Sequence, residues 1–122
     1  MSARRILVVD DDGEMRDAMA HILRAAGYEV ELAHDGNAAI EAQLARPADV
    51  LITDVFMPAR DGLETIQYFR SEYPDIRIIA MTGGSPMGRI DEYLGVAKVA
   101  GADATLRKPF AAQTLLESLS AL

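Results

Sequence analysis

The sequence predicts a three-layer α/β domain in which a five-stranded parallel sheet, in the strand order 2-1-3-4-5, carries helices on both faces. Two observations support this prediction. Five short apolar runs alternate strictly with five segments of helical spacing, which is the pattern of βαβ units with right-handed crossovers. The length of 122 residues and the hydrophobic share of 50% suit a single domain that buries one ordinary core.

The five expected strands are short and apolar, and they cover residues 6–9, 28–33, 50–53, 76–81 and 104–106. Val50, Leu51 and Ile52 are consecutive apolar residues, which favours a central strand that is buried on both faces. Polar and apolar residues alternate over residues 28–32, as expected for a strand at the edge of the sheet. A central third strand and an edge second strand agree with the order 2-1-3-4-5.

The first expected helix is the clearest, because its apolar residues recur three and four positions apart from Met15 to Ala26. It ends at Gly27, a common residue just beyond a helix C-terminus. The same spacing predicts four further helices around residues 36–44, 63–73, 90–97 and 115–119. Pro47 and Pro74 end the second and third of these five helices, since proline cannot continue a helix.

The composition excludes several classes of function. The chain has 12 Lys and Arg against 19 Asp and Glu, a formal net charge of −7, and its scattered basic residues argue against nucleic-acid binding. No stretch approaches the ~18 apolar residues of a membrane span, and the apolar run at residues 6–9 is too short for a signal peptide. The lack of cysteine excludes disulfides and thiol catalysis, and a reducing cytoplasm is the simplest location.

Polar side chains follow four of the five expected strands, at the point where each strand ends. Asp10 and Asp11 follow the first strand, Asp54 the third and Lys108 the fifth, while Thr82 ends the fourth. In an open α/β sheet the ligand site lies outside the carboxyl ends of the strands. We therefore expect these side chains to meet at one edge of the sheet.

Such a cluster of carboxylates needs a cation. Two carboxylates about 5 Å apart repel each other by roughly 3 kcal/mol at an effective dielectric near 20. An all-oxygen set with room for water suits Mg²⁺, with Mn²⁺ as a second candidate. We expect Asp11 and Asp54 to bind the ion directly and Asp10 to act largely through water.

The same residues provide what phosphoryl transfer needs, namely a nucleophile and positive charge for the phosphoryl oxygens. Asp54 is the expected nucleophile and would become an acyl phosphate. Lys108 would pair with one phosphoryl oxygen, and Thr82 would donate a hydrogen bond to another.

The chain resembles the receiver domains of bacterial two-component response regulators over essentially all of its length. The resemblance rests on residues 6–11, residues 49–58, Asp61-Gly62, Thr82 and the run from Gly101 through Lys108-Pro109-Phe110. It implies that Asp54 accepts a phosphoryl group from a histidine kinase. It also implies that Asp10, Asp11, Asp54 and the backbone carbonyl of Phe56 hold Mg²⁺, and that the Lys108–Pro109 peptide is cis.

The sequence departs from the family pattern in its switch and in its hydrolysis machinery. Thr82 and Thr105 occupy the switch positions, but Thr105 replaces the usual Tyr or Phe, so coupling through an aromatic rotamer is not expected. The Gly-rich segment 83–100 is our candidate for the element that changes on phosphorylation. Phe56 and Gly84 cannot orient an attacking water, which predicts a long-lived phosphoaspartate.

The expected function is that of a stand-alone phosphoacceptor. Residues 1–122 would form one receiver domain without an output domain, so the signal would pass to a protein target or, by phosphorelay, to a histidine phosphotransfer protein. Nucleic acid and membrane are not expected partners. The protein would not be an enzyme beyond catalysing its own phosphorylation and slow dephosphorylation.

Two alternatives remain. Residues 9–13 also resemble the signature of haloacid-dehalogenase-type phosphatases, in which Asp10 would be the nucleophile and Mg²⁺ the cofactor. Against it, Glu14 stands where a Thr is usual, and the chain is short for that family. Asp11 and Glu14 also have the spacing of a capping box, with Asp11 as the N-cap of the first helix.

Overall fold

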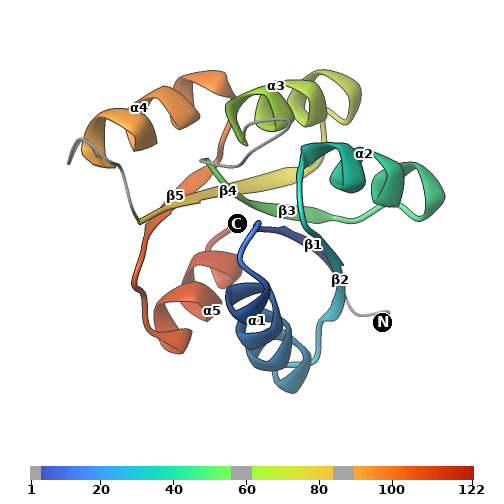
Figure 1. Cartoon of the computed structure of the whole chain (residues 1–122), viewed down its shortest axis with the longest axis vertical. Helices are drawn as coiled ribbons and strands as arrows, with labels where there is room; N and C mark the ends of the chain where they lie inside the picture. The colour runs from blue at the N-terminus through green and yellow to red at the C-terminus, as the bar shows by residue number, and fades with distance from the viewer. Residues whose placement is uncertain (1–3, 56–61, 84–89) are drawn as a thin grey trace.

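The computed structural model describes residues 4–55, 62–83 and 90–122. Strands and helices alternate along these residues, as the sequence predicts (Figure 1). In chain order the elements are β1 (Arg5–Val9), α1 (Gly13–Ala25), β2 (Glu29–Ala33), α2 (Gly36–Ala45), β3 (Val50–Asp54), α3 (Gly62–Glu72), β4 (Arg77–Thr82), α4 (Ile90–Ala100), β5 (Ala104–Arg107) and α5 (Ala112–Ser120). Every strand boundary lies within one residue of its expected position.

The strands form one parallel sheet in the order β2-β1-β3-β4-β5, which confirms the predicted topology. Helices α1 and α5 cover one face of the sheet, and α2, α3 and α4 cover the other (Figure 1). Because all five strands are parallel, their carboxyl ends lie at one edge of the sheet and their amino ends at the opposite edge. We call these the carboxyl edge and the amino edge.

The core consists of two apolar layers, one on each face of the sheet. Side chains alternate along β1, so that Ile6 and Val8 pack toward α1 and α5, whereas Leu7 and Val9 pack toward the other helices. Every residue of β3 is buried, as its uninterrupted apolar sequence predicts. Among the described residues, no helix is long and apolar enough to cross a membrane.

Helix α1 begins with Asp12 as its N-cap. The Asp12 Oδ1 atom accepts hydrogen bonds from the backbone N–H groups of Glu14, at 3.0 Å, and Met15, at 3.4 Å. The alternative in which Asp11 caps the helix is therefore wrong. The exposed carboxylate of Asp11 is not used by the cap.

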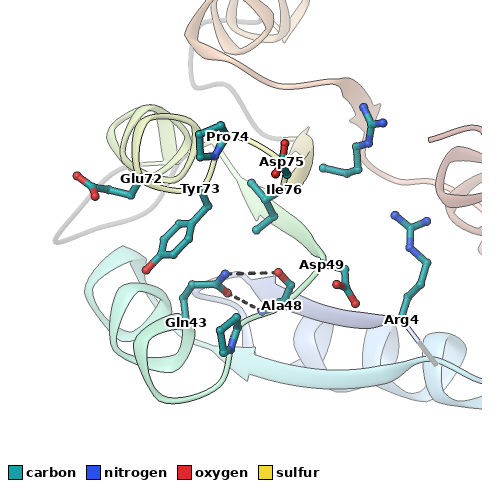
Figure 2. A pocket seen from close by; sticks show the side chains of 11 residues that line it. Arg4, Gln43, Ala48, Asp49, Glu72, Tyr73, Pro74, Asp75 and Ile76 are labelled. Carbon is teal, nitrogen blue, oxygen red and sulfur yellow. Dashed lines mark hydrogen bonds between the residues drawn. The ribbon is translucent and has the colours of Figure 1, made fainter. Parts of the chain in front are cut away.

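The amino edge holds a hollow of about 610 Å³ between the ends of α2, α3, β3 and β4 (Figure 2). Two polar side chains in its wall, those of Gln43 and Asp49, are hydrogen-bonded to the backbone. The buried Gln43 amide exchanges two hydrogen bonds with the backbone of Ala48, at 2.9 and 3.4 Å. The Asp49 carboxylate accepts a hydrogen bond from the backbone N–H of Arg5 at 2.8 Å.

Arg70 at the end of α3 joins several chain segments at the same edge. Its guanidinium donates to the carbonyl oxygens of Gly101, Pro74 and Ile76 over 2.9–3.0 Å and pairs with the Asp103 carboxylate at 2.7 Å. Gly101 has a φ of +132°, and a Cβ atom there would press on the Arg70 side chain. This network fixes the ends of α3 and α4 against β4 and β5.

Candidate functional site

The carboxyl edge brings together the polar residues that the sequence places at strand ends. Asp10 follows β1 directly, Asp54 and Thr82 are the last residues of β3 and β4, and Lys108 follows β5. Carboxylate oxygens of Asp10, Asp11 and Asp54 all lie within 4.8 Å of one another. Segments up to 98 residues apart in the chain therefore meet at this point.

The two inner carboxylates are buried and share one lysine. Asp10 is 0% exposed and Asp54 is 8% exposed. The Lys108 ammonium donates to Oδ2 of Asp10 at 2.6 Å and to Oδ2 of Asp54 at 2.9 Å. The other oxygen of Asp10, Oδ1, accepts the backbone N–H of Asp12 at 3.0 Å.

Lys108 is held in its charged form by these neighbours. Burial alone would lower the pKa of the ammonium, but the hydrogen bonds to Asp10 and Asp54 and the attraction of their charges outweigh it. The pKa of Lys108 is therefore raised above its ordinary value of 10.5. Lys108 is shared by two of the three carboxylates, so it matches their formal negative charge only in part.

The donor set fits a hard divalent cation. Oxygens on opposite sides of a Mg²⁺ ion lie about 4 Å apart, because each Mg–O bond measures about 2.1 Å. The spread of the three carboxylate oxygens, within 4.8 Å, is close to that size. Asp11 is exposed, which leaves water free to complete the coordination shell. Phe56, whose carbonyl is a further predicted ligand, lies outside the described residues.

Thr82 brings an unpaired hydroxyl to the same edge. Its side chain is 0% exposed, and its Oγ1 has no hydrogen-bond partner among the described residues. Leaving such a group unpaired costs about 1–3 kcal/mol. The Thr82 carbonyl accepts the backbone N–H of Lys108 at 2.8 Å, which keeps the hydroxyl and the ammonium on neighbouring strands. The arrangement suits an anion that accepts from both groups.

Two glycines allow the backbone to close around these side chains. A Cβ atom on Gly62 would collide with the carbonyl oxygen of Asp54, and one on Gly83 would collide with the side chain of Lys108. In the sequence, Gly62 is distinguished only by the Asp61-Gly62 pair, and Gly83 only as part of a Gly-rich segment. The end of β3 excludes a side chain at Gly62, and Lys108, which follows β5, excludes one at Gly83.

The remaining residues lie around the acidic cluster or farther from it. Thr105 lies half-buried in β5 beside Ala80, and its role as a switch position stays a prediction. The Lys108–Pro109 peptide is cis, the expected isomer. Arg16 of α1 extends to the acidic edge and donates to the carbonyl of Asp10.

Comparison with known proteins places this site in a family. The model of the response regulator receiver domain matches residues 6–120. Response regulator MprA of Mycobacterium ulcerans is 42% identical over 118 residues, which cover 97% of this chain and 49% of that protein. The chain thus spans about half the length of the curated relatives it matches.

Solved structures show the same fold over the whole chain. The chemotaxis protein CheY4 of Vibrio cholerae is 35% identical, with a TM-score of 0.87 and coverage of 98% of both chains. The receiver domain of NtrX from Brucella abortus is 28% identical, with a TM-score of 0.86 and coverage of 95% of both chains. Fold, strand-end residues and family model agree, and the chain belongs to the receiver domain family of two-component response regulators.

Proposed function

We propose that Asp54 is the phosphoacceptor of this receiver domain and that a histidine kinase is the donor. The observation that carries the proposal is the position of Lys108, whose ammonium contacts both Asp54 and Asp10 at the carboxyl edge. A cation there can follow the negative charge from the carboxylate to the incoming phosphoryl group. Receiver domains as a family act as phosphoacceptor switches, which supports the same role for this chain.

In the proposed reaction, a carboxylate oxygen of Asp54 forms a bond to phosphorus as the bond from phosphorus to the histidine nitrogen breaks. The imidazole leaves as a neutral ring when its second nitrogen carries a proton. Lys108 pairs with one phosphoryl oxygen, and the Thr82 hydroxyl donates to another, which would give this buried group a partner that it lacks among the described residues. Each such donor is worth about 100-fold or more in rate when it is preorganised.

A divalent ion held by Asp10, Asp11 and Asp54, Mg²⁺ or Mn²⁺, would neutralise charge that builds on the phosphoryl oxygens. Asp10 and Asp54 are fixed by Lys108, whereas Asp11 is exposed and can meet the ion from the solvent side. The carbonyl of Phe56 is proposed as a further ligand because the family resemblance implies it.

The phosphatase alternative is less well supported. It requires Asp10 as the nucleophile, but Asp10 is fully buried and both of its carboxylate oxygens are engaged, one by Asp12 and one by Lys108. A nucleophile must be open to its substrate. The family model that matches residues 6–120 of this chain describes the receiver domain and not a phosphatase.

The proposed output is protein contact or phosphorelay. Residues 1–122 are proposed to act as the phosphoacceptor domain, passing the signal to a protein target or to a histidine phosphotransfer protein. The proposed location is the cytoplasm, which the family and the cysteine-free composition favour. The slow loss of phosphate expected from Phe56 and Gly84 stays a prediction, since both residues lie outside the described residues.

The test is to incubate the protein with Mg²⁺ and a small acyl phosphate donor, then map the modified residue by mass spectrometry. We expect label on Asp54, none after Asp54→Asn, and normal labelling after Asp49→Asn, a matched change at the amino edge. Label on Asp10, or steady turnover of the donor that survives Asp54→Asn, would establish the phosphatase alternative instead.

A further inference from the structure

Arg16 occupies an unusual place for a cation. It lies near the start of α1, where the partial positive charge of the helix N-terminus disfavours a positive side chain. Its guanidinium nonetheless turns back toward the strand end, and Nη1 donates to the carbonyl oxygen of Asp10 at 2.6 Å. A short hydrogen bond from a charged donor in a partly buried setting offsets that unfavourable placement.

This bond completes the fixation of Asp10. The backbone N–H of Asp10 donates to Ala33 at 3.2 Å, and its two carboxylate oxygens are held by Asp12 and Lys108. The carbonyl oxygen lies just beyond β1, where the pairing of β1 with β2 ends. Arg16 supplies the hydrogen bond that the sheet no longer provides there.

The carbonyl of Asp10 belongs to the peptide plane that links Asp10 to Asp11. Because that plane is rigid, fixing its oxygen fixes the direction in which the backbone of Asp11 leaves the strand. Asp11 itself is exposed and is not used by the helix cap. Arg16 therefore restricts the position of the Asp11 backbone, from which the carboxylate extends.

We propose that Arg16 is a positioning residue for the acidic pair Asp10 and Asp11, acting through the peptide that joins them. This inference rests on the proposed function, because the pair is useful only if it holds a cation. Groups that orient the ligands of a metal typically contribute about 10-fold to 100-fold to its affinity.

Two simpler roles for Arg16 predict other effects of its removal on Mg²⁺ affinity. If Arg16 acted only as a positive charge near the three carboxylates, it would repel a divalent ion, and its removal would tighten binding. If Arg16 served only to stabilise the helix start, its removal would lower thermal stability and leave affinity for the ion unchanged. The positioning role alone predicts weaker binding.

The test measures Mg²⁺ affinity by following backbone amide resonances in NMR titrations of wild type, Arg16→Met and Arg24→Met. Arg24 is a close control, because it lies on the same helix and donates to the carbonyl of Val30, also six residues away, at 3.1 Å. We expect the Kd for Mg²⁺ to rise about 10-fold in Arg16→Met and to stay within about 2-fold in Arg24→Met.

An unchanged or tighter Kd in Arg16→Met would overturn the positioning role. If Arg16→Met does not fold, Arg16→Gln is a second neutral variant to which the same criterion applies. Wild-type protein that neither binds Mg²⁺ nor accepts a phosphoryl group on Asp54 would refute the proposed function, and the inference with it. Normal wild-type behaviour together with a normal Arg16→Met would refute the inference alone.

Discussion

The two edges of the sheet both carry clusters of charged residues, but they use them differently. At the amino edge the carboxylates of Asp49 and Asp103 accept backbone N–H groups, and Arg70 donates to backbone carbonyls. At the carboxyl edge three carboxylates face one another with a single lysine among them. Charge matched by the backbone supports the fold, whereas charge left in excess indicates a binding site.

The shape of the surface does not make this distinction. The hollow of about 610 Å³ lies at the amino edge (Figure 2), whereas the acidic cluster lies at the carboxyl edge. The amide of Gln43 in its wall is already paired with Ala48. The hydroxyl of Thr82 at the carboxyl edge has no partner among the described residues. The buried hydroxyl without a partner in the described structure, and not this hollow, lies where the proposed chemistry occurs.

If the carboxyl edge is the reactive one, Lys108→Met should have the largest effect on the phosphorylation rate. Replacement by Met removes the ammonium that faces Asp54 and the incoming phosphoryl group, so phosphorylation should slow by about 100-fold to 1000-fold. The rate of labelling by a small acyl phosphate donor measures this. Lys98→Met, at an exposed position of α4, is the control and should label normally. A Lys108→Met rate within about 3-fold of wild type would contradict the assignment.

The matched change at the amino edge is Arg70→Met. It leaves the carbonyls of Gly101 and Ile76 and the carboxylate of Asp103 without their guanidinium donor. We expect the free energy of unfolding to fall by about 2–3 kcal/mol, measured by urea denaturation, while the phosphorylation rate stays within about 2-fold. A large loss of rate with normal stability would show that the amino edge takes part in the chemistry.

Gln43→Met tests the structural role of the amino edge by removing one buried amide that is paired with the backbone of Ala48. The backbone N–H and carbonyl of Ala48 would lose their partners, at a cost of about 2 kcal/mol in the free energy of unfolding. Phosphorylation should be unaffected. If the variant is as stable as wild type, the pairing at this edge contributes little, and the contrast between the edges weakens.

Thr82→Val also removes one buried polar group, but at the carboxyl edge, and we expect the opposite effect on the free energy of unfolding. Since the buried hydroxyl has no partner in the described structure, its removal should leave stability unchanged or raise it by about 1 kcal/mol. Phosphorylation should slow by about 100-fold, because one donor to the phosphoryl oxygens is lost. Loss of stability without loss of rate would assign Thr82 to the core instead.

The sequence predicts the fold well because the fold depends on local patterns. The strict alternation of strands and helices leads to the parallel sheet, and the apolar run of Val50, Leu51 and Ile52 identifies the central strand. The strand-end residues of the site follow from the same pattern, since parallel strands deliver their carboxyl ends to one edge. Asp10, Asp54 and Lys108 needed no further information to be placed together.

Other features depend on contacts that no local pattern contains. Arg70 and Gly101 are 31 residues apart, and nothing near either one indicates their hydrogen bond. The need for glycine at position 83 comes from Lys108, which is 25 residues away in the sequence. The choice of Asp12 over Asp11 as the N-cap depends on the backbone angles of one residue, because both have suitable side chains.

Paramagnetic Mn²⁺ at a substoichiometric concentration tests directly whether a divalent ion binds at the carboxyl edge while the amino edge is structural, because the ion broadens the amide resonances of nearby residues. We expect resonances of residues 10–13, 54–55 and 82–83 to broaden first, while those of residues 43–49 and 101–103 remain sharp. Broadening that is strongest at the amino edge, or that spreads evenly over the protein, would contradict it.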